Sequence, residues 1–175
     1  MNKKYELTNI SKIAFGRKIY RIIAIKDFNN VKKGDIGGYV ESEYNLSHED
    51  ICWIYGDAVV FGDAGVSDDA LVYGNALVYD NAVVYGNARV FGDAGVSDDA
   101  YIESNDDYSI IYNFGSKNRI ATFFKCKDDT IKVNCGGFYG TINEFREKVK
   151  TIHKDNKYAK EYLMIADLME LKING

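Results

Sequence analysis

The sequence predicts a mainly β protein built on a parallel β-helix, with a β-hairpin before it and an α+β module after it. Three observations predict this fold: a six-residue repeat in the middle of the chain, a short hairpin pattern near the N-terminus, and mixed strand and helix patterns in the last third. The composition, 46% hydrophobic and 27% charged over 175 residues, is typical of a folded protein without membrane spans. The predicted domains are a hairpin cap (1–35), a β-helix (36–107) and a C-terminal α+β module (108–175).

The hairpin is expected within residues 13–28, which read IAFGRKIYRIIAIKDF. We place its turn at Gly16 and Arg17 because glycine breaks the apolar run there. A β-helix whose first coil is open presents unpaired strand edges. The hairpin is therefore expected to cover that coil.

The repeat begins at Trp53 and reads WIYGDA, VVFGDA, GVSDDA, LVYGNA, LVYDNA, VVYGNA, RVFGDA and GVSDDA. The second position is always Ile or Val and the sixth is always Ala. Residues two apart in an extended chain point the same way, so Ala58 and Val60 both face inward. Three such strands make one coil of 18 residues, and coils stack about 4.8 Å apart.

The positions within the hexad also predict what is buried. Val72 and Val84 are expected in the core, while Asp68 and Asp98 are expected in solvent. Glycine, Asn and Asp at the corners tolerate left-handed backbone conformations. Counting backwards in sixes places Val40, Leu46 and Cys52 at the small inner position of one earlier coil.

The C-terminal module is expected to contain strands at 109–114, 119–126 and 130–135. Thr141 followed by Glu144 forms a capping box, which opens a helix of about ten residues. Asn156 caps a second helix. Its apolar residues recur at helical spacing: Tyr158, Tyr162, Ile165, Met169 and Ile173.

These motifs carry a family resemblance. The small-x-aliphatic hexads over residues 53–106 resemble the hexapeptide-repeat left-handed β-helix, which implies a left-handed coil. The segments GGYVESEYNLS (37–47) and CWIYGDA (52–58) resemble the N-terminal part of acetyltransferase-like hexapeptide proteins and of phage and prophage proteins. FGSKNRIATFFK and CGGFYGTINEF are similar to a C-terminal module found on such β-helices in phage proteins.

Charge divides the chain into three blocks behind a net charge of −4. Residues 1–33 carry nine bases and two acids, residues 34–107 one base and sixteen acids, and residues 108–175 twelve bases and eight acids. An acidic centre thus lies between two basic ends. A block of like charge is commonly just a solvated face.

Cysteine usage and targeting signals indicate the compartment. Cys52, Cys126 and Cys135 form no CxxC pair, which argues against a disulfide framework and a sulfur-ligated zinc site. No apolar run is long enough to span a membrane, and no signal-type stretch follows the N-terminus. The predicted location is the cytoplasm, that of the host if a phage encodes the protein. No cofactor and no metal site are predicted.

Two glycine-containing loops of the module are the first candidate site. One is a turn carrying two bases, and the other is expected to run into a helix N-terminus, whose free N–H groups suit phosphate. Aromatic rings nearby suit a nucleotide base. The competing reading is a plain turn and a plain helix cap. The candidate ligand-binding residues are Lys117, Asn118, Arg119, Gly136, Gly137, Tyr139 and Thr141.

The acidic corners are the second candidate site. Their charge density resembles that of duplex DNA, so they could imitate nucleic acid towards a host nucleic-acid-binding protein. The competing reading is structural, because corners three hexads apart alternate Asp and Asn and can form amide ladders. Direct binding of DNA by this acidic β-helix is not expected. The candidate acidic surface consists of Asp57, Asp63, Asp69, Asp93 and Asp99.

Outward aromatic residues predict that a face of the β-helix is covered. Tyr55, Tyr73 and Phe91 fall on one face, Phe61 and Tyr79 on the next. Either the C-terminal module or another subunit would cover such a face. A homo-oligomer is therefore expected, either a trimer, as the resemblance to hexapeptide-repeat proteins implies, or a dimer.

The sequence favours a non-catalytic binding protein over an enzyme. Acyl transfer needs a general base, and the only histidines, His48 and His153, lie outside the clear repeats. The resemblance to phage and prophage proteins implies a role against host defences, either sequestering a nucleotide signal or blocking a host enzyme. The alternative is a hexapeptide-repeat acetyltransferase.

Overall fold

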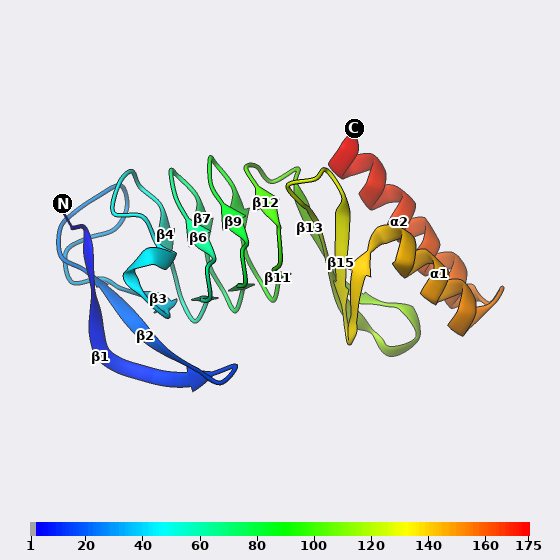
Figure 1. Ribbon diagram of the computed structural model, residues 1–175, viewed down its shortest axis with the longest axis horizontal. Helices are drawn as coiled ribbons and strands as arrows, with labels where there is room; N and C mark the ends of the chain where they lie inside the picture. The colour runs from blue at the N-terminus through cyan, green and yellow to red at the C-terminus, as the bar shows by residue number, and fades with distance from the viewer. Residues whose placement is uncertain (1–2) are drawn as a thin grey trace. The chain divides into compact units, whose positions relative to one another are not determined.

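The hexad repeat folds as a parallel β-solenoid whose strands stack in three columns (Figure 1). The computed structural model describes residues 3–175, and the chain divides into two units, Met1–Asn105 and Asp106–Gly175. The hairpin belongs to the first unit. The elements of that unit are β1 (Tyr5–Ala14), β2 (Arg17–Ala24), β3 (Ile36–Val40), η1 (Glu43–Asn45), β4 (Trp53–Ile54), β5 (Val59–Val60), β6 (Gly65–Val66), β7 (Leu71–Val72), β8 (Leu77–Val78), β9 (Val83–Val84), β10 (Arg89–Val90), β11 (Gly95–Val96) and β12 (Tyr101–Ile102).

The three columns are parallel and in register. One column contains β3, β5, β8 and β11, the second β4, β7 and β10, and the third β6, β9 and β12. Val60 lies beside Val78, and Val78 beside Val96. The predicted parallel β-helix is therefore confirmed.

The two inner positions of every hexad are buried, as predicted. Alanine suits one of them because the interior of an 18-residue coil is narrow, and the aliphatic residue two positions later fills the rest. None of these residues is more than 1% exposed: Ala58, Val60, Ala64, Val66, Ala70, Val72, Ala76, Val78, Ala82, Val84, Ala88, Val90, Ala94, Val96 and Ala100.

The corners repeat the same backbone conformation every six residues. From residue 56 to residue 98, the fourth residue of each hexad has a positive φ and is glycine or aspartate. Asp98, expected in solvent, is half-buried, whereas Asp68 is exposed. The corner residues with positive φ are Gly56, Gly62, Asp68, Gly74, Asp80, Gly86, Gly92 and Asp98.

The first coil departs from the predicted count. Val40 pairs with Val60, and Leu46 bridges to Val66, so both occupy the aliphatic position rather than the small one. Cys52 does occupy the small position, because Trp53 N–H, directly after it, bonds to the carbonyl of Ala70. Two extra residues in the corner before Cys52 cause the shift, and the regular hexads offer no sign of them.

The N-terminal hairpin covers the edge of the solenoid, as predicted, but its turn lies one residue earlier. Phe15 and Gly16 form the turn, both with positive φ, and β2 pairs antiparallel with β3. The turn places the Phe15 ring 5.2 Å from that of Phe61, which in turn stacks 5.2 Å from Tyr79. The hairpin therefore covers part of the outward aromatic face, for which the C-terminal module or another subunit was the expected cover.

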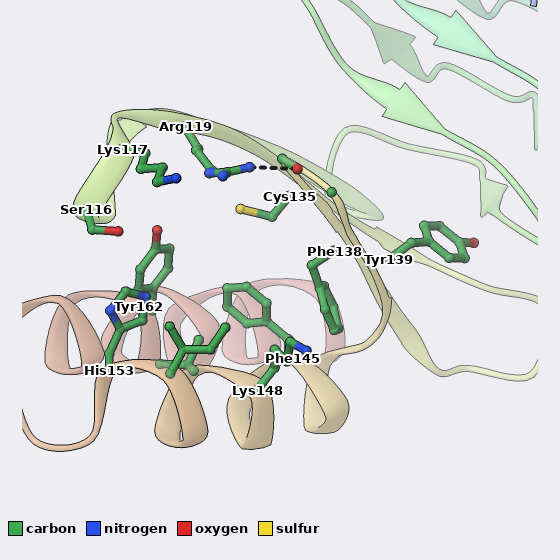
Figure 2. A pocket seen from close by; sticks show the side chains of 14 residues that line it. Ser116, Lys117, Arg119, Cys135, Phe138, Tyr139, Phe145, Lys148, His153 and Tyr162 are labelled. Carbon is green, nitrogen blue, oxygen red and sulfur yellow. Dashed lines mark hydrogen bonds between the residues drawn. The ribbon is translucent and has the colours of Figure 1, made fainter.

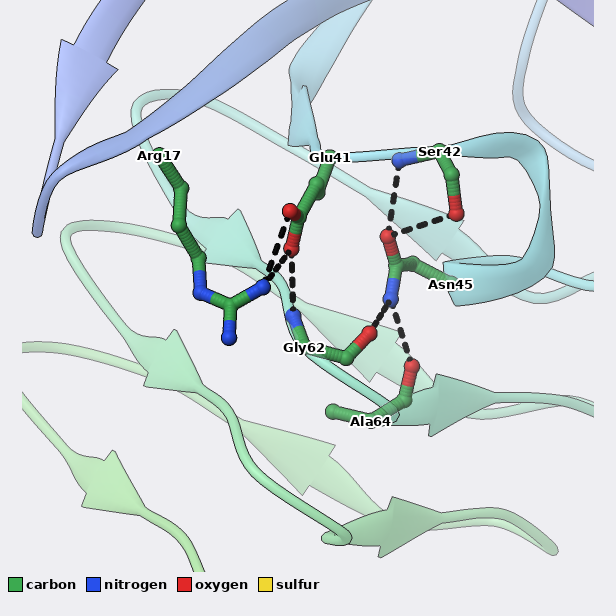
Figure 3. Close-up of polar contacts among 6 residues, drawn as sticks. All are labelled: Arg17, Glu41, Ser42, Asn45, Gly62 and Ala64. Carbon is green, nitrogen blue, oxygen red and sulfur yellow. Dashed lines mark hydrogen bonds and ion pairs between the residues drawn. The ribbon is translucent and has the colours of Figure 1, made fainter.

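Polar contacts fix the chain where it enters the first coil (Figure 3). The Glu41 carboxylate accepts a hydrogen bond from Gly62 N–H at 2.8 Å and forms an ion pair with Arg17 at 2.9 Å. Buried Asn45 donates through Nδ2 to the carbonyls of Gly62 and Ala64, at 3.0 and 2.8 Å. These bonds tie η1 to the coil below it.

The second unit is a four-stranded antiparallel sheet with two helices on one face. The capping box of Thr141 and Glu144 and the cap at Asn156 are confirmed. The predicted loop before the first helix contains a further strand, β16. Its elements are β13 (Tyr108–Phe114), η2 (Gly115–Lys117), β14 (Arg119–Lys125), β15 (Ile131–Cys135), β16 (Phe138–Thr141), α1 (Ile142–His153) and α2 (Lys157–Asn174). Within residues 3–175, neither helix is long and apolar enough to cross a membrane.

Candidate functional site

A cavity of about 550 Å³ opens in the second unit, between the turns of the sheet and the helices (Figure 2). The η2 turn and the start of β14 supply Ser116, Lys117 and Arg119. The β15–β16 turn forms a second wall, and α1 and α2 form the floor. Its volume lies in the range of small-molecule sites.

The lining is basic. Lys117, Arg119 and Lys148 are basic side chains, and His153 adds an imidazole. No acidic residue of the described chain is among the lining residues. An anion entering this pocket would meet several cations and no carboxylate.

Two glycines with positive φ shape the pocket. At Gly136 a side chain would collide with the Arg119 side chain, whose guanidinium donates to the Gly136 carbonyl at 2.6 Å. At Gly115 a side chain would collide with the Tyr162 ring. Because glycine has no side chain, Arg119 can pack against residue 136 and Tyr162 against residue 115.

Aromatic rings form the apolar wall. Phe138 lies 5.4 Å from Phe145, and Phe145 lies 5.8 Å from Tyr162, measured between ring centroids. His153 stacks on Tyr162 at 5.2 Å with an interplanar angle of 26°. A planar ligand ring would find aromatic surfaces of this kind favourable.

The structure brings most of the predicted loop residues together. Lys117, Arg119, Gly136 and Gly137 all line the pocket. Tyr139 lines it too, but its side chain points away from the other rings in Figure 2. Phe138 supplies the ring instead, because successive residues of β16 face opposite sides of the sheet.

The other two predicted residues lie at the ends of helices and do not line the pocket. Asn118 ends η2 in the left-handed conformation, with φ 47°, and it does not line the pocket. Thr141 caps α1, and the Glu144 carboxylate accepts hydrogen bonds from its N–H and hydroxyl, both at 2.8 Å. These bonds hold the pKa of Glu144 below its usual value. A negative group therefore lies at the helix N-terminus that was expected to receive phosphate, and the pocket is formed further along α1.

Sequence reasoning missed the residues that the helices contribute. Phe145, Lys148, Val149 and Ile152 lie three or four apart and so share one face of α1. That spacing was available from the sequence, but nothing in it connected this face to the two loops. Cys135 was also missed; its thiol points into the pocket, and burial raises its pKa.

The acidic corners do not form one surface. Asp57 and Asp93 lie on one corner column, Asp63 and Asp99 on a second, and Asp69 on a third. Asp57 forms an ion pair with Arg21 at 2.9 Å, although its side chain stays 67% exposed. In the same column Asn75 donates to Asp93 at 3.0 Å, which is the ladder bond that the structural reading predicted.

Neither histidine lies in a repeat, and the described residues contain no cluster of three metal-ligating side chains. The His48 ring packs against that of Tyr5 in a tilted arrangement, with 4.3 Å between the ring centroids, and burial lowers the pKa of His48. This packing gives His48 a structural role in the first coil. His153 lines the pocket of the second unit instead.

Comparison with known proteins supports the solenoid. A family model of the YdcK β-solenoid repeat matches residues 70–86 and 84–98, which include β7 to β11. No curated protein matches the chain. The chain is thus similar, over these coils, to a family of β-solenoid repeats, and it is a β-helix repeat protein.

Proposed function

We propose that this is a non-catalytic binding protein, and that the pocket of the second unit holds a phosphate-bearing nucleotide. One observation carries the proposal: the pocket combines Lys117, Arg119 and Lys148 with a wall of aromatic rings and has no acidic lining residue in the described chain. Cations recognise phosphate, and the rings recognise a base. The solenoid and its hairpin would serve as a stable support.

The resemblance of the chain to phage and prophage proteins supports a role for this binding against host defences. A protein that holds a nucleotide without converting it lowers the free concentration of that nucleotide. We therefore propose that it acts in the cytoplasm by sequestering a nucleotide signal of a host defence system.

Calorimetric titration with nucleoside mono-, di- and triphosphates tests the proposal, with the matching nucleosides and inorganic phosphate alongside. We expect a nucleotide to bind more tightly than either of its parts. The double variant Lys117→Ala with Arg119→Ala should weaken binding at least tenfold, because a charge-assisted hydrogen bond is worth about 1.5–3 kcal/mol.

A matched control removes two cations from the same unit but outside the pocket: Lys127→Ala with Lys160→Ala. These side chains are exposed and do not line the cavity. Equal losses in the two double variants would mean that the net charge of the unit, and not the pocket, attracts the ligand. Saturable binding of acetyl-CoA with turnover would instead favour the acetyltransferase alternative.

A further inference from the structure

A lysine amine and a cysteine thiol meet in the interior of the first unit. Lys4 is 1% exposed and Cys52 is fully buried. The Lys4 Nζ lies 3.2 Å from the Cys52 Sγ, and it also donates to the carbonyls of Glu49 and Asp50, at 2.8 and 3.3 Å. The two residues are 48 positions apart in the chain.

Packing alone does not explain this pair. Burying an ammonium group costs free energy that an apolar side chain would not incur. Cys52 occupies the inner position at which all eight complete hexads have alanine. The chain thus places a nucleophilic sulfur where the lysine side chain ends.

We propose that Lys4 and Cys52 form an oxidation-dependent covalent link. A peroxide first oxidises the thiol to a sulfenic acid and is itself reduced to water. The Lys4 ammonium loses one proton to solvent, and the freed lone pair of its nitrogen bonds to sulfur as the S–O bond breaks. The hydroxyl leaves as water with a second proton from that nitrogen.

The position of the pair sets the rate and the consequence. Burial raises the pKa of the Cys52 thiol, so its oxidation is expected to be slower than that of an exposed thiolate. Lys4 directly precedes β1, the edge strand of its sheet, and local opening of an edge admits small oxidants. The link would join the capping hairpin covalently to the first coil.

Mass spectrometry of the full chain after graded hydrogen peroxide tests the link. After proteolysis without reductant, we expect a peptide pair that joins Lys4 to Cys52 and weighs about 2 Da less than the two separate peptides. Dithiothreitol should remove it. The oxidised protein should also melt at a higher temperature, because the link restricts the unfolded chain.

Lys4→Met is the matched variant, because it keeps a long apolar side chain and removes the amine. In this variant we expect no link and more Cys52 trapped by dimedone as the sulfenic acid, with Cys126 and Cys135 as references within the same molecule. The mass-spectrometric test uses the wild-type protein, so it does not depend on whether the variant folds. Two results overturn the proposal: dimedone traps Cys52 equally with and without the amine, or Cys52 stays a free thiol at every dose that leaves the far-ultraviolet circular dichroism native.

Discussion

Single residues with left-handed backbone conformations set the corners of the solenoid from residue 56 to residue 98. Glycine adopts this conformation without strain, whereas Asp68, Asp80 and Asp98 adopt it with φ between 54° and 58°. Aspartate is one of the few residues with a side chain that tolerates it, because its carboxylate can bond locally. In the hexads GVSDDA and LVYDNA, the aspartate at the fourth position therefore makes the turn that glycine makes in the other hexads.

The first prediction concerns Asp98, which is half-buried and has a φ of 58°. Asp98→Ser is expected to lower the free energy of unfolding by about 1 kcal/mol, because serine is strained in this conformation. Asp98→Gly should cost less. Urea denaturation of the three proteins measures both changes, and equal midpoints for the serine variant and the wild type would contradict the strain argument.

The second prediction concerns Asn45, whose amide nitrogen donates to two backbone carbonyls of the next coil, those of Gly62 and Ala64. Asn45→Asp replaces this donor with a carboxylate facing the same oxygens, and we expect a loss of about 3 kcal/mol at neutral pH. Asn9→Asp, at an exposed position of β1, is the control. Equal unfolding free energies for the two variants would show that the Asn45 bonds contribute nothing.

Among the elements, the hairpin is joined to the coils by the pairing of β2 with β3 and by side-chain contacts beside it. Glu41 follows β3, and its carboxylate connects Arg17 at the start of β2 to the backbone of Gly62 in the next coil. The Gly62 N–H bond and the ion pair hold the pKa of Glu41 below its ordinary value of 4.5. This connection should therefore depend on pH.

The third prediction follows from that pKa. A lowered pKa in the folded protein stabilises it above the ordinary pKa of the group, and this contribution is lost as the pH falls through the folded value. Glu41→Gln should melt at a lower temperature than the wild type at pH 7, and the difference should shrink as the pH approaches 3. Melting curves from pH 7 to pH 3 measure this, and a difference that does not change with pH would contradict it.

How far the sequence predicts each element depends on whether its signal is local. The hexads set Ala58 and Val60 inside because the period of a strand fixes both positions. The predicted positions of Val40 and Leu46 in the first coil were wrong, because the two additional residues in the next corner do not show in the periodicity of the sequence. The capping box at Thr141 was predicted because its partners are three residues apart. The pocket was only half predicted, because Phe145 and Lys148 join Arg119 through tertiary packing.

Over the whole molecule, the boundary between the acidic centre and the basic C-terminal block lies close to the boundary between the two structural units, and the basic N-terminal block belongs to the first unit. The acidic block is almost entirely solenoid, and the basic block of residues 108–175 contains the pocket. The solenoid acids are distributed over three corner columns, where Asn75 already pairs with Asp93. This distribution favours the structural interpretation of the acidic corners.

The fourth prediction separates the two candidate surfaces. Replacing Asp63, Asp69 and Asp99 with Asn should leave nucleotide binding unchanged within about twofold, because these side chains are exposed in the other unit. Binding should weaken as salt rises, since several cations line the pocket. Titration of this triple variant at low and high salt measures both effects. Loss of binding in the triple variant would indicate that the solenoid acids take part.

Identical sequence occupies different faces of the solenoid. The nonapeptide GDAGVSDDA occurs at residues 62–70 and again at 92–100, and its Gly-Val pair forms β6 in one column and β11 in another. The sequence of a hexad thus determines that it forms one side of a coil, but it does not determine which of the three columns that side joins. Gain or loss of 18 residues would only change the height of the stack. Gain or loss of six would rotate every later strand by one column and exchange the neighbours of all the outward aromatic residues, so duplication of whole coils is the route by which such a chain can lengthen without repacking its surface.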